Sequence, residues 1–436
     1  MRRKAVAALT LAAVLLTACG GQEAAQGLKT FTEPGTLSGE VASTKKGESA
    51  VLVKEGGAVF VNNAEISRRF SGKPGKAETA GIFVSSGKAV VNNSNLTTDA
   101  AGAAGILVTG EGELEVADSA LATAGEKSPG LTARGKGGVY AWDNIVGTTG
   151  SESPAILVGG GESSMTLDGG TFTATGEQSP AISAAGKGWI HAATLTAGNA
   201  EALSLTEGAA LSLYDCNLSG NMPAPGGNQK NAAVVFRRAN ESDGSAEAAQ
   251  LLISGGTVLT QQGHLFYADG AAATVVVKGS TLAQDSAESD LFRASNGAKS
   301  SFIVYGEIME GHIGTDADAN LKLYLRDISK FTGDIVEEAG PGNAEAPGTT
   351  LYVDGTSIWV VSGDSKLRAL YAEGLVKDTE GLDVTIQGED GTVFRKGDSR
   401  YTVTVTGEYR TSADFSGIPS ADEYAAHAAE RPESLR

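Results

Sequence analysis

Cysteine, histidine and aromatic residues are scarce in this chain of 436 residues, which has two Cys, four His and 6% Phe, Trp and Tyr. Two cysteines cannot build the disulfide framework that stabilises many small secreted domains. Long helical patterns are nearly absent as well, whereas 59 glycines favour frequent turns. The composition is therefore typical of a turn-rich all-β protein.

Positive charge is also in short supply. The chain has 34 Lys and Arg against 52 Asp and Glu, which gives a formal net charge of −18. A chain this acidic is repelled by phosphate backbones and by anionic membrane surfaces. We therefore expect no nucleic-acid partner, and we interpret the charge as a source of solubility.

Residues 1–18 have the pattern of a signal peptide. Basic residues 2–4 precede an apolar stretch, residues 5–16, that is too short to cross a bilayer as a helix. The sequence Leu-Thr-Ala-Cys-Gly that follows resembles the lipobox of bacterial lipoproteins. This resemblance implies cleavage before Cys19, lipidation of its thiol and attachment to the outside of a bacterial membrane at the cell surface. An ordinary secretory peptide with an incidental cysteine is the alternative.

A fixed spacing dominates the rest of the chain. Apolar residues, each preceded by a small residue, recur at steps of 24, 25, 25 and 26 residues, at Ile82, Ile106, Leu131, Ile156 and Ile182. Such self-similarity indicates one supersecondary unit stacked into a rod. We predict a parallel β-helix, a solenoid of about ten to twelve coils, over residues 49–376. The five residues above, with Leu203 and Val234, should form one inward column. A leucine-rich repeat fits less well because the framework positions hold Ala, Val, Thr and Ile.

One turn position recurs three residues before the apolar opener of the third strand in each coil. It holds residue types that tolerate the left-handed backbone region, namely Asn63, Asn93, Asp118, Asp143, Gly169, Asp215, Gly255, Gly279 and Gly306. Ala192 is the exception, and we predict a differently built turn there. We interpret the position as a structural corner and not as a binding site.

A specific resemblance lies in residues 320–376. This stretch contains Phe-Thr-Gly-Asp-Ile at 331–335, then Trp359, then the turn Gly-Asp-Ser at 363–365, followed by Leu367 and Leu370. In these features the chain resembles the end of an autotransporter passenger of the pertactin type. The resemblance implies a right-handed single-stranded parallel β-helix displayed as a surface stalk, commonly for adhesion. Because those passengers precede a membrane β-barrel and only about 60 residues follow here, we expect lipid on Cys19 to replace the barrel as the anchor.

The segments that flank the repeat are predicted separately. Residues 19–48 show no repeat and are predicted to be a flexible tether. Residues 377–436 are predicted to form a C-terminal β cap with a hairpin turn at Asp390-Gly391, followed by a short helix opened by Ser420 and Glu423. A solenoid needs such a cover because an open strand edge invites aggregation.

Catalytic patterns of the kinds used on β-helix scaffolds are missing. The sequence has no Gly-His-Gly, no Arg-Ile-Lys and no G-x-S-x-G. Its histidines are not spaced as in metal-binding motifs such as H-E-x-x-H. We interpret Asp316 and Asp318 as a solvated turn and Cys216 as a packed small hydrophobe. We expect no cofactor and no metal site, and an adhesin or interaction rod is the leading hypothesis. A polysaccharide lyase or hydrolase on the same scaffold is the competing one.

A candidate binding stripe for a glycan or protein ligand is predicted on the outer face of the first strand. It consists of Phe83, Leu107, Leu157, Val235, Phe266, Tyr267 and Phe292. Two alternatives stay open: a loop covers the stripe, or the register inverts near Arg293, which falls on an inward position. Near residues 221–231 and 239–247 the coil step grows to 31, and these insertions are either tolerated drift or binding surfaces.

Overall fold

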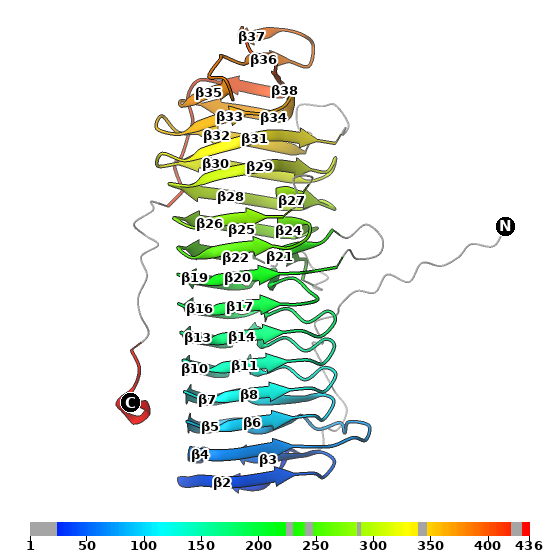
Figure 1. Cartoon of the computed structure of the whole chain (residues 1–436), viewed down its shortest axis with the longest axis vertical. Coiled ribbons are helices and arrows are strands. Elements are labelled where there is room, and N and C mark those ends of the chain that lie inside the picture. Colours follow the sequence, from blue (N-terminus) through cyan, green and yellow to red (C-terminus); the bar gives the residue numbers. More distant parts are fainter. Residues whose placement is uncertain (1–23, 224–229, 240–246, 286–288, 339–346, 420–429) are drawn as a thin grey trace, which may run out of the picture.

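The rod is built from one repeated turn of three strands. The computed structural model describes residues 24–223, 230–239, 247–285, 289–338, 347–419 and 430–436. There the chain winds into a parallel β-solenoid of about 12 turns, as predicted (Figure 1). Each strand pairs in parallel with the equivalent strand of the next turn, so three columns of strands surround one core. The right-handed sense of the winding stays a prediction.

The strands fall into these columns by their pairing. The first column holds β1 (Gln26–Phe31), β3 (Glu48–Val53), β9 (Leu131–Gly135), β12 (Ile156–Gly161), β15 (Ile182–Ala184), β18 (Leu203–Thr206), β21 (Ala232–Arg237), β24 (His264–Asp269) and β27 (Asp290–Ser295). The second holds β10 (Gly138–Trp142), β13 (Ser164–Asp168), β16 (Lys187–His191), β19 (Ala210–Tyr214), β22 (Ala249–Ser254), β25 (Ala272–Lys278), β28 (Lys299–Tyr305), β30 (Asn320–Arg326), β32 (Gly348–Val353) and β34 (Ser365–Ala372). The third holds β6 (Asn95–Thr98), β8 (Ala120–Thr123), β11 (Ile145–Thr148), β14 (Thr171–Ala174), β17 (Thr194–Ala197), β20 (Asn217–Gly220), β23 (Thr257–Thr260), β26 (Thr281–Gln284), β33 (Ile358–Val361) and β35 (Leu375–Asp378).

Six long strands continue around a corner and belong to two columns each. Four lie near the start of the rod and two near its other end: β2 (Gly35–Ser43), β4 (Ala58–Arg68), β5 (Thr79–Asn92), β7 (Ala103–Ala117), β29 (Ile308–Thr315) and β31 (Lys330–Glu337). Sharing one backbone between two columns fixes the pairing of both at once, because any slip would have to occur in both.

The predicted inward column is confirmed. Each of its members is the register partner of the next and has 0% of its surface exposed, as shown by Ile82, Ile106, Leu131, Ile156, Ile182, Leu203 and Val234. Along a strand, side chains alternate between core and exterior, so this register decides which residues can face a ligand.

The prediction for the two phenylalanines of the stripe is wrong. Val234 pairs with Phe266, and Phe266 pairs with Phe292, so both rings continue the inward column and are fully buried. The predicted step of 31 residues leads from Val234 to Leu265, which is one residue short of Phe266, the true partner of Val234. A slip of one residue exchanges the two faces of a strand. Tyr267 and Arg293 therefore occupy the outward positions, which removes the anomaly noted at Arg293.

The rest of the stripe is covered. Phe83 and Leu107 are 4% and 3% exposed and pack in one apolar cluster with Leu52. Tyr267 is fully buried and packs with its neighbour Val235. Leu157 alone is half-buried. An exposed apolar contact surface is therefore not present along this file.

The predicted tether is also wrong over most of its length. β1 pairs with β3 and β2 pairs with β4, so residues 26–43 form the first turn of the solenoid. At the other end β36 (Thr385–Gly388) and β37 (Val393–Arg395) form the predicted antiparallel hairpin. There β38 (Thr402–Arg410) pairs with both β36 and β34. The short helix predicted from Ser420 lies outside the described residues, and η2 (Glu433–Leu435) is a single 3₁₀ turn.

The corner between the second and third columns has the left-handed backbone expected there. All nine corner residues have a positive φ, from 44° at Asn93 to 74° at Gly255. Ala192 has a φ of 52° as well, so the prediction of a different turn at Ala192 is wrong. Just inside the corner, a hydroxyl or amide oxygen of one turn accepts the backbone N–H of the previous turn, as from Ser94 to Ser119 Oγ at 3.1 Å. Such ladders satisfy polar backbone groups that the core would otherwise leave unpaired.

Candidate functional site

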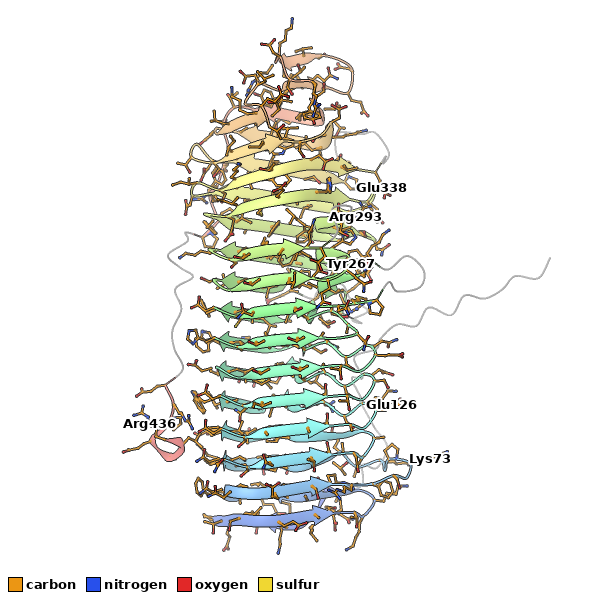
Figure 2. All side chains as sticks on the ribbon, in the orientation of Figure 1. Lys73, Glu126, Tyr267, Arg293, Glu338 and Arg436 are labelled. Carbon is orange, nitrogen blue, oxygen red and sulfur yellow. The ribbon has the colours of Figure 1, made fainter. Side chains whose placement is uncertain are left out.

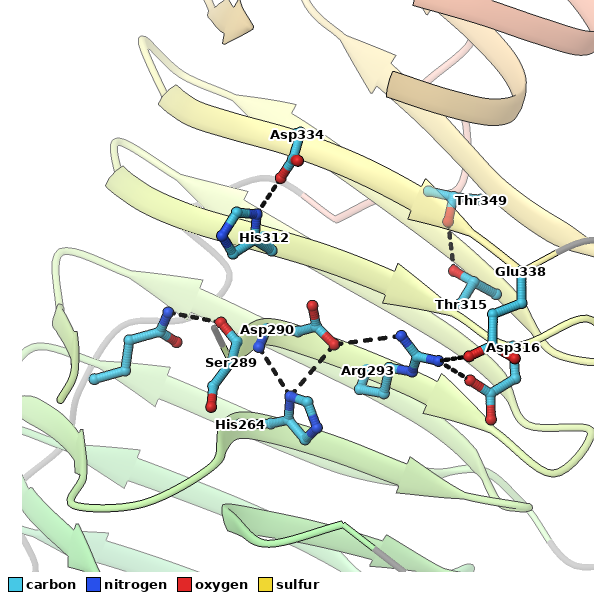
Figure 3. A network of polar contacts seen from close by, with 11 residues as sticks. His264, Ser289, Asp290, Arg293, His312, Thr315, Asp316, Asp334, Glu338 and Thr349 are labelled. Atoms are coloured by element: carbon cyan, nitrogen blue, oxygen red, sulfur yellow. Dashed lines mark hydrogen bonds and ion pairs between the residues drawn. The ribbon is translucent and has the colours of Figure 1, made fainter. Parts of the chain in front are cut away.

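A file of alternating histidines and aspartates lies on the first column, where β24, β27, β29 and β31 stack (Figure 3). Asp290 is the register partner of His312, and His312 is the register partner of Asp334. His264 precedes them, with its Nδ1 3.3 Å from Asp290 Oδ2. His312 Nδ1 contacts the Asp334 carboxylate directly. We call these four residues the His–Asp file.

Arg293 lies beside this file and gathers three carboxylates. Its guanidinium is 3.6 Å from Asp290 Oδ2, 2.6 Å from Glu338 Oε1 and in direct contact with Asp316. The side chain of Arg293 is only 13% exposed. We call Arg293 with these three acids the Arg293 cluster. Asp316 and Asp318 lie in a turn after β29 as predicted, and Asp318 is exposed, but Asp316 is in addition an ion-pair partner of Arg293.

A glycine makes the geometry of the Arg293 cluster possible. Gly314 is the register partner of Arg293 in the next turn. A Cβ at Gly314 would lie 2.6 Å from the guanidinium of Arg293 and 2.5 Å from Asp290 Oδ2, which is closer than real atoms approach. The guanidinium therefore lies over a position that has no side chain, and from there it reaches Glu338 two turns away (Figure 2).

Burial shifts the proton affinities within the site. Burial, helped by the charge of Arg293, lowers the pKa of His264 to about 4, and its Nδ1 accepts the backbone N–H of Asp290 at 2.8 Å. At neutral pH the ring is therefore uncharged, with its proton on Nε2. Burial also raises the pKa of Asp290 to about 6, although Arg293 opposes the shift. Burial likewise raises the pKa of Tyr267 to about 12.

The arrangement offers fixed polar groups with an exposed edge. Glu338 and His312 have 59% and 38% of their side chains exposed, whereas His264 and Asp290 have 12% each. His264 and Asp290 are thus buried against each other, whereas Glu338 and His312 reach the solvent. Such an edge can hydrogen-bond a polar ligand, because the strands below it fix the direction of each side chain.

The remaining sequence candidates lie away from this site. Cys216 is fully buried, its Sγ donates to the carbonyl of Tyr214 at 3.3 Å, and burial raises its thiol pKa to about 11, so it is a packed side chain as predicted. His191 lies on the second column, where its Nδ1 is 2.7 Å from Asp168 Oδ1. Cys19 lies outside the described residues.

Sequence reasoning missed the site although a signal was present. His264, Asp290, His312 and Asp334 are separated by 26, 22 and 22 residues, which are steps of about one turn. A search for charged residues at the repeat step, instead of at motif spacing, would have found them. The register error between Val234 and Leu265 hid them, since it placed Arg293 in the core.

Comparisons with known proteins add no family. The chain matches no family model, and no curated protein matches its sequence. Within the described residues, no helix is long and apolar enough to span a membrane. In the same part of the chain, no group of three or more His, Cys, Asp and Glu side chains is arranged to hold a metal ion.

Proposed function

We propose that this chain is a lipid-anchored solenoid, displayed at a bacterial cell surface, that binds a ligand along its side and catalyses no reaction. The lipobox-like sequence before Cys19 supports the anchor. The resemblance of residues 320–376 to autotransporter passengers supports display as an adhesin-like stalk. A rod of stacked turns suits this role, since it can carry a binding edge away from the surface that holds it.

The observation that carries the binding role is the exposed edge of the Arg293 cluster and the His–Asp file. His312 projects from a strand that pairs with both neighbouring turns, and Glu338 directly follows β31, where its backbone N–H donates to the carbonyl of Thr315 at 3.0 Å. These fixed positions leave little ordering to be done when a ligand binds. Carboxylate and imidazole groups pair well with hydroxyl groups, which favours a glycan ligand.

A glycan array probed with the purified chain tests this proposal. Glu338→Gln should weaken the binding of any captured glycan about tenfold, which is the loss of one charge-assisted hydrogen bond. Gly314→Ala should weaken it similarly, because the new methyl group displaces the Arg293 guanidinium. Glu55→Gln, an exposed acid near the other end of the rod, is the matched control and should bind normally. If the chain binds no glycan and no matrix protein, the binding role is contradicted and a structural spacer is the remaining interpretation.

One observation favours the enzyme hypothesis as a second candidate. Three carboxylates converge on Arg293, and the pKa of Asp290 is raised to about 6, which is a value suited to proton transfer near neutral pH. The test is whether the chain degrades an acidic polysaccharide and whether Asp290→Asn abolishes this activity while the far-UV circular dichroism stays unchanged. Both results together would favour a lyase or hydrolase over a binding rod. Binding without new reducing ends or unsaturated products supports the rod.

A further inference from the structure

Two described segments that follow β38 lie against the rod at different places along it. After β38, residues 411–419 lie against the second column, where Phe415 contacts Tyr324 and Tyr352, and Tyr305 donates its hydroxyl hydrogen to the carbonyl of Pro419. Residues 430–436, the docking segment, lie against a different part of the same column. Figure 2 shows Arg436 on the edge of the rod opposite to Arg293.

The docking segment makes two kinds of contact. Leu435 is fully buried against Ala117 and Trp142. Arg431 forms an ion pair with Asp118 and lies 3.7 Å from Asp143. The backbone of η2 sets the spacing, because Leu435 N–H donates to the carbonyl of Pro432 and so turns Leu435 toward the rod while Arg431 faces the corner. We call Ala117, Asp118, Trp142 and Asp143 the docking site.

The docking site is unlike the equivalent positions of neighbouring turns. Ala117 and Trp142 are register partners, and a small residue beside a large flat one leaves a recess for Leu435. The partners on either side are Asn92 and Asp168, which are polar. Asp118 and Asp143 are the one pair of adjacent acids among the predicted corner residues. The apolar recess and the acidic pair therefore lie on the same two adjacent turns of the rod.

The segment does not fill the space around it. An open pocket of about 400 Å³ lies between the rod and the docking segment, lined by Glu115, Tyr140, Trp142, Glu430 and Pro432 among others. Six parallel pairings separate Trp142 from Tyr305, which is roughly 29 Å along the rod. Pro419 and Arg431 are twelve residues apart in the sequence, and twelve residues span at most about 40 Å, which exceeds this distance.

From these contacts we infer that the docking site is a peptide-recognition site for an Arg-x-x-x-Leu segment, and that residues 430–436 of the same chain are its built-in, exchangeable ligand. The arginine selects the acidic pair and the leucine fills the recess beside Trp142. The intramolecular segment closes the site because tethering gives it an effective concentration near the millimolar range. A free peptide of the same sequence competes only when this segment is released. The inference is independent of the proposed function.

The test uses the full chain and a labelled synthetic peptide, Glu-Arg-Pro-Glu-Ser-Leu-Arg, followed by fluorescence anisotropy. The double variant Arg431→Glu, Leu435→Ala releases the segment and leaves the site intact. We expect saturable binding to this variant and at least tenfold weaker binding to the unmodified chain. Adding Trp142→Ala, or Asp118→Asn with Asp143→Asn, to the double variant should lower the affinity at least tenfold. A peptide with its first Arg replaced by Glu is the matched control and should not bind.

Two results overturn the inference. One is the absence of binding to the double variant when its circular dichroism matches that of the unmodified chain. The other is equal binding to both proteins, which would show a non-specific attraction of the peptide's arginines to an acidic rod. Raising the salt concentration from 0.05 M to 0.5 M separates the contributions further, because it should weaken the Arg-dependent part of the affinity and spare the leucine contact.

Discussion

Phe292→Ala is the substitution that most directly probes the corrected register. Phe292 is fully buried in the inward column. Its ring centroid is 6.0 Å from that of Phe266 and 5.4 Å from that of Phe302. Truncation removes the transfer free energy of the ring and leaves a cavity that cannot collapse, because hydrogen bonds hold the turns above and below in place. We expect a loss of about 3–5 kcal/mol in the free energy of unfolding.

Urea unfolding followed by far-UV circular dichroism measures this loss. A solenoid can unfold in parts, so hydrogen exchange of β24, β27 and β28 should accompany the measurement and show where protection is lost. The control is Phe394→Ala, since Phe394 is 44% exposed on β37 and its truncation should cost much less. If Phe292→Ala lowers the free energy of unfolding by less than about 1 kcal/mol and β27 keeps full protection, Phe292 lies on the outer face and the register is refuted.

Three further perturbations have defined outcomes. Burial raises the pKa of Glu337 to about 7 from 4.5, so the contribution of this side chain to stability is present below pH 4.5 and is lost as the pH rises through 7. In urea titrations, the free energy of unfolding of the wild type, relative to that of Glu337→Gln, should therefore rise by about 3 kcal/mol when the pH falls from 8 to 4.5. Ser153→Ala removes the acceptor of the Ser128 N–H at 2.9 Å and should cost about 1–3 kcal/mol in the same assay, and a neutral result would mean that water replaces the hydroxyl. Cys19→Ala should release the chain from membranes in cell fractionation, whereas retention would contradict the lipid anchor.

The periodic part of the fold was predictable because it repeats. Ile82 and the residues at its step needed only a fixed period and a small residue before each, and both are visible in the sequence. The first turn was missed for the opposite reason. β1 and β2 are mostly exposed and polar, with few apolar side chains such as Leu37 and Val41 facing inward. A terminal turn covers the end of the core, so it departs from the repeat.

The candidate site was less predictable because it depends on an accumulated register. The loops before β22 and β24 change the step between turns, and an error of one residue there reversed the faces of Phe266 and Arg293. Gly314 gave no local signal either, since its role exists only beside Arg293. The contact of Leu435 with Trp142 joins residues about 290 positions apart, and no local pattern encodes such a pairing.

Oxidative cross-linking of engineered cysteines between turns tests the stacking on which both sites depend. Thr173 and Thr196 are outward register partners on β14 and β17, so their Cα atoms lie within the range that a disulfide bridges. In a Cys19→Ser background, Thr173→Cys with Thr196→Cys should oxidise fully, whereas Thr171→Cys with Thr196→Cys, offset by two residues, should not. Cys216 is buried with a raised thiol pKa and should not interfere. Equal oxidation of both pairs, or of the offset pair alone, would contradict the in-register solenoid.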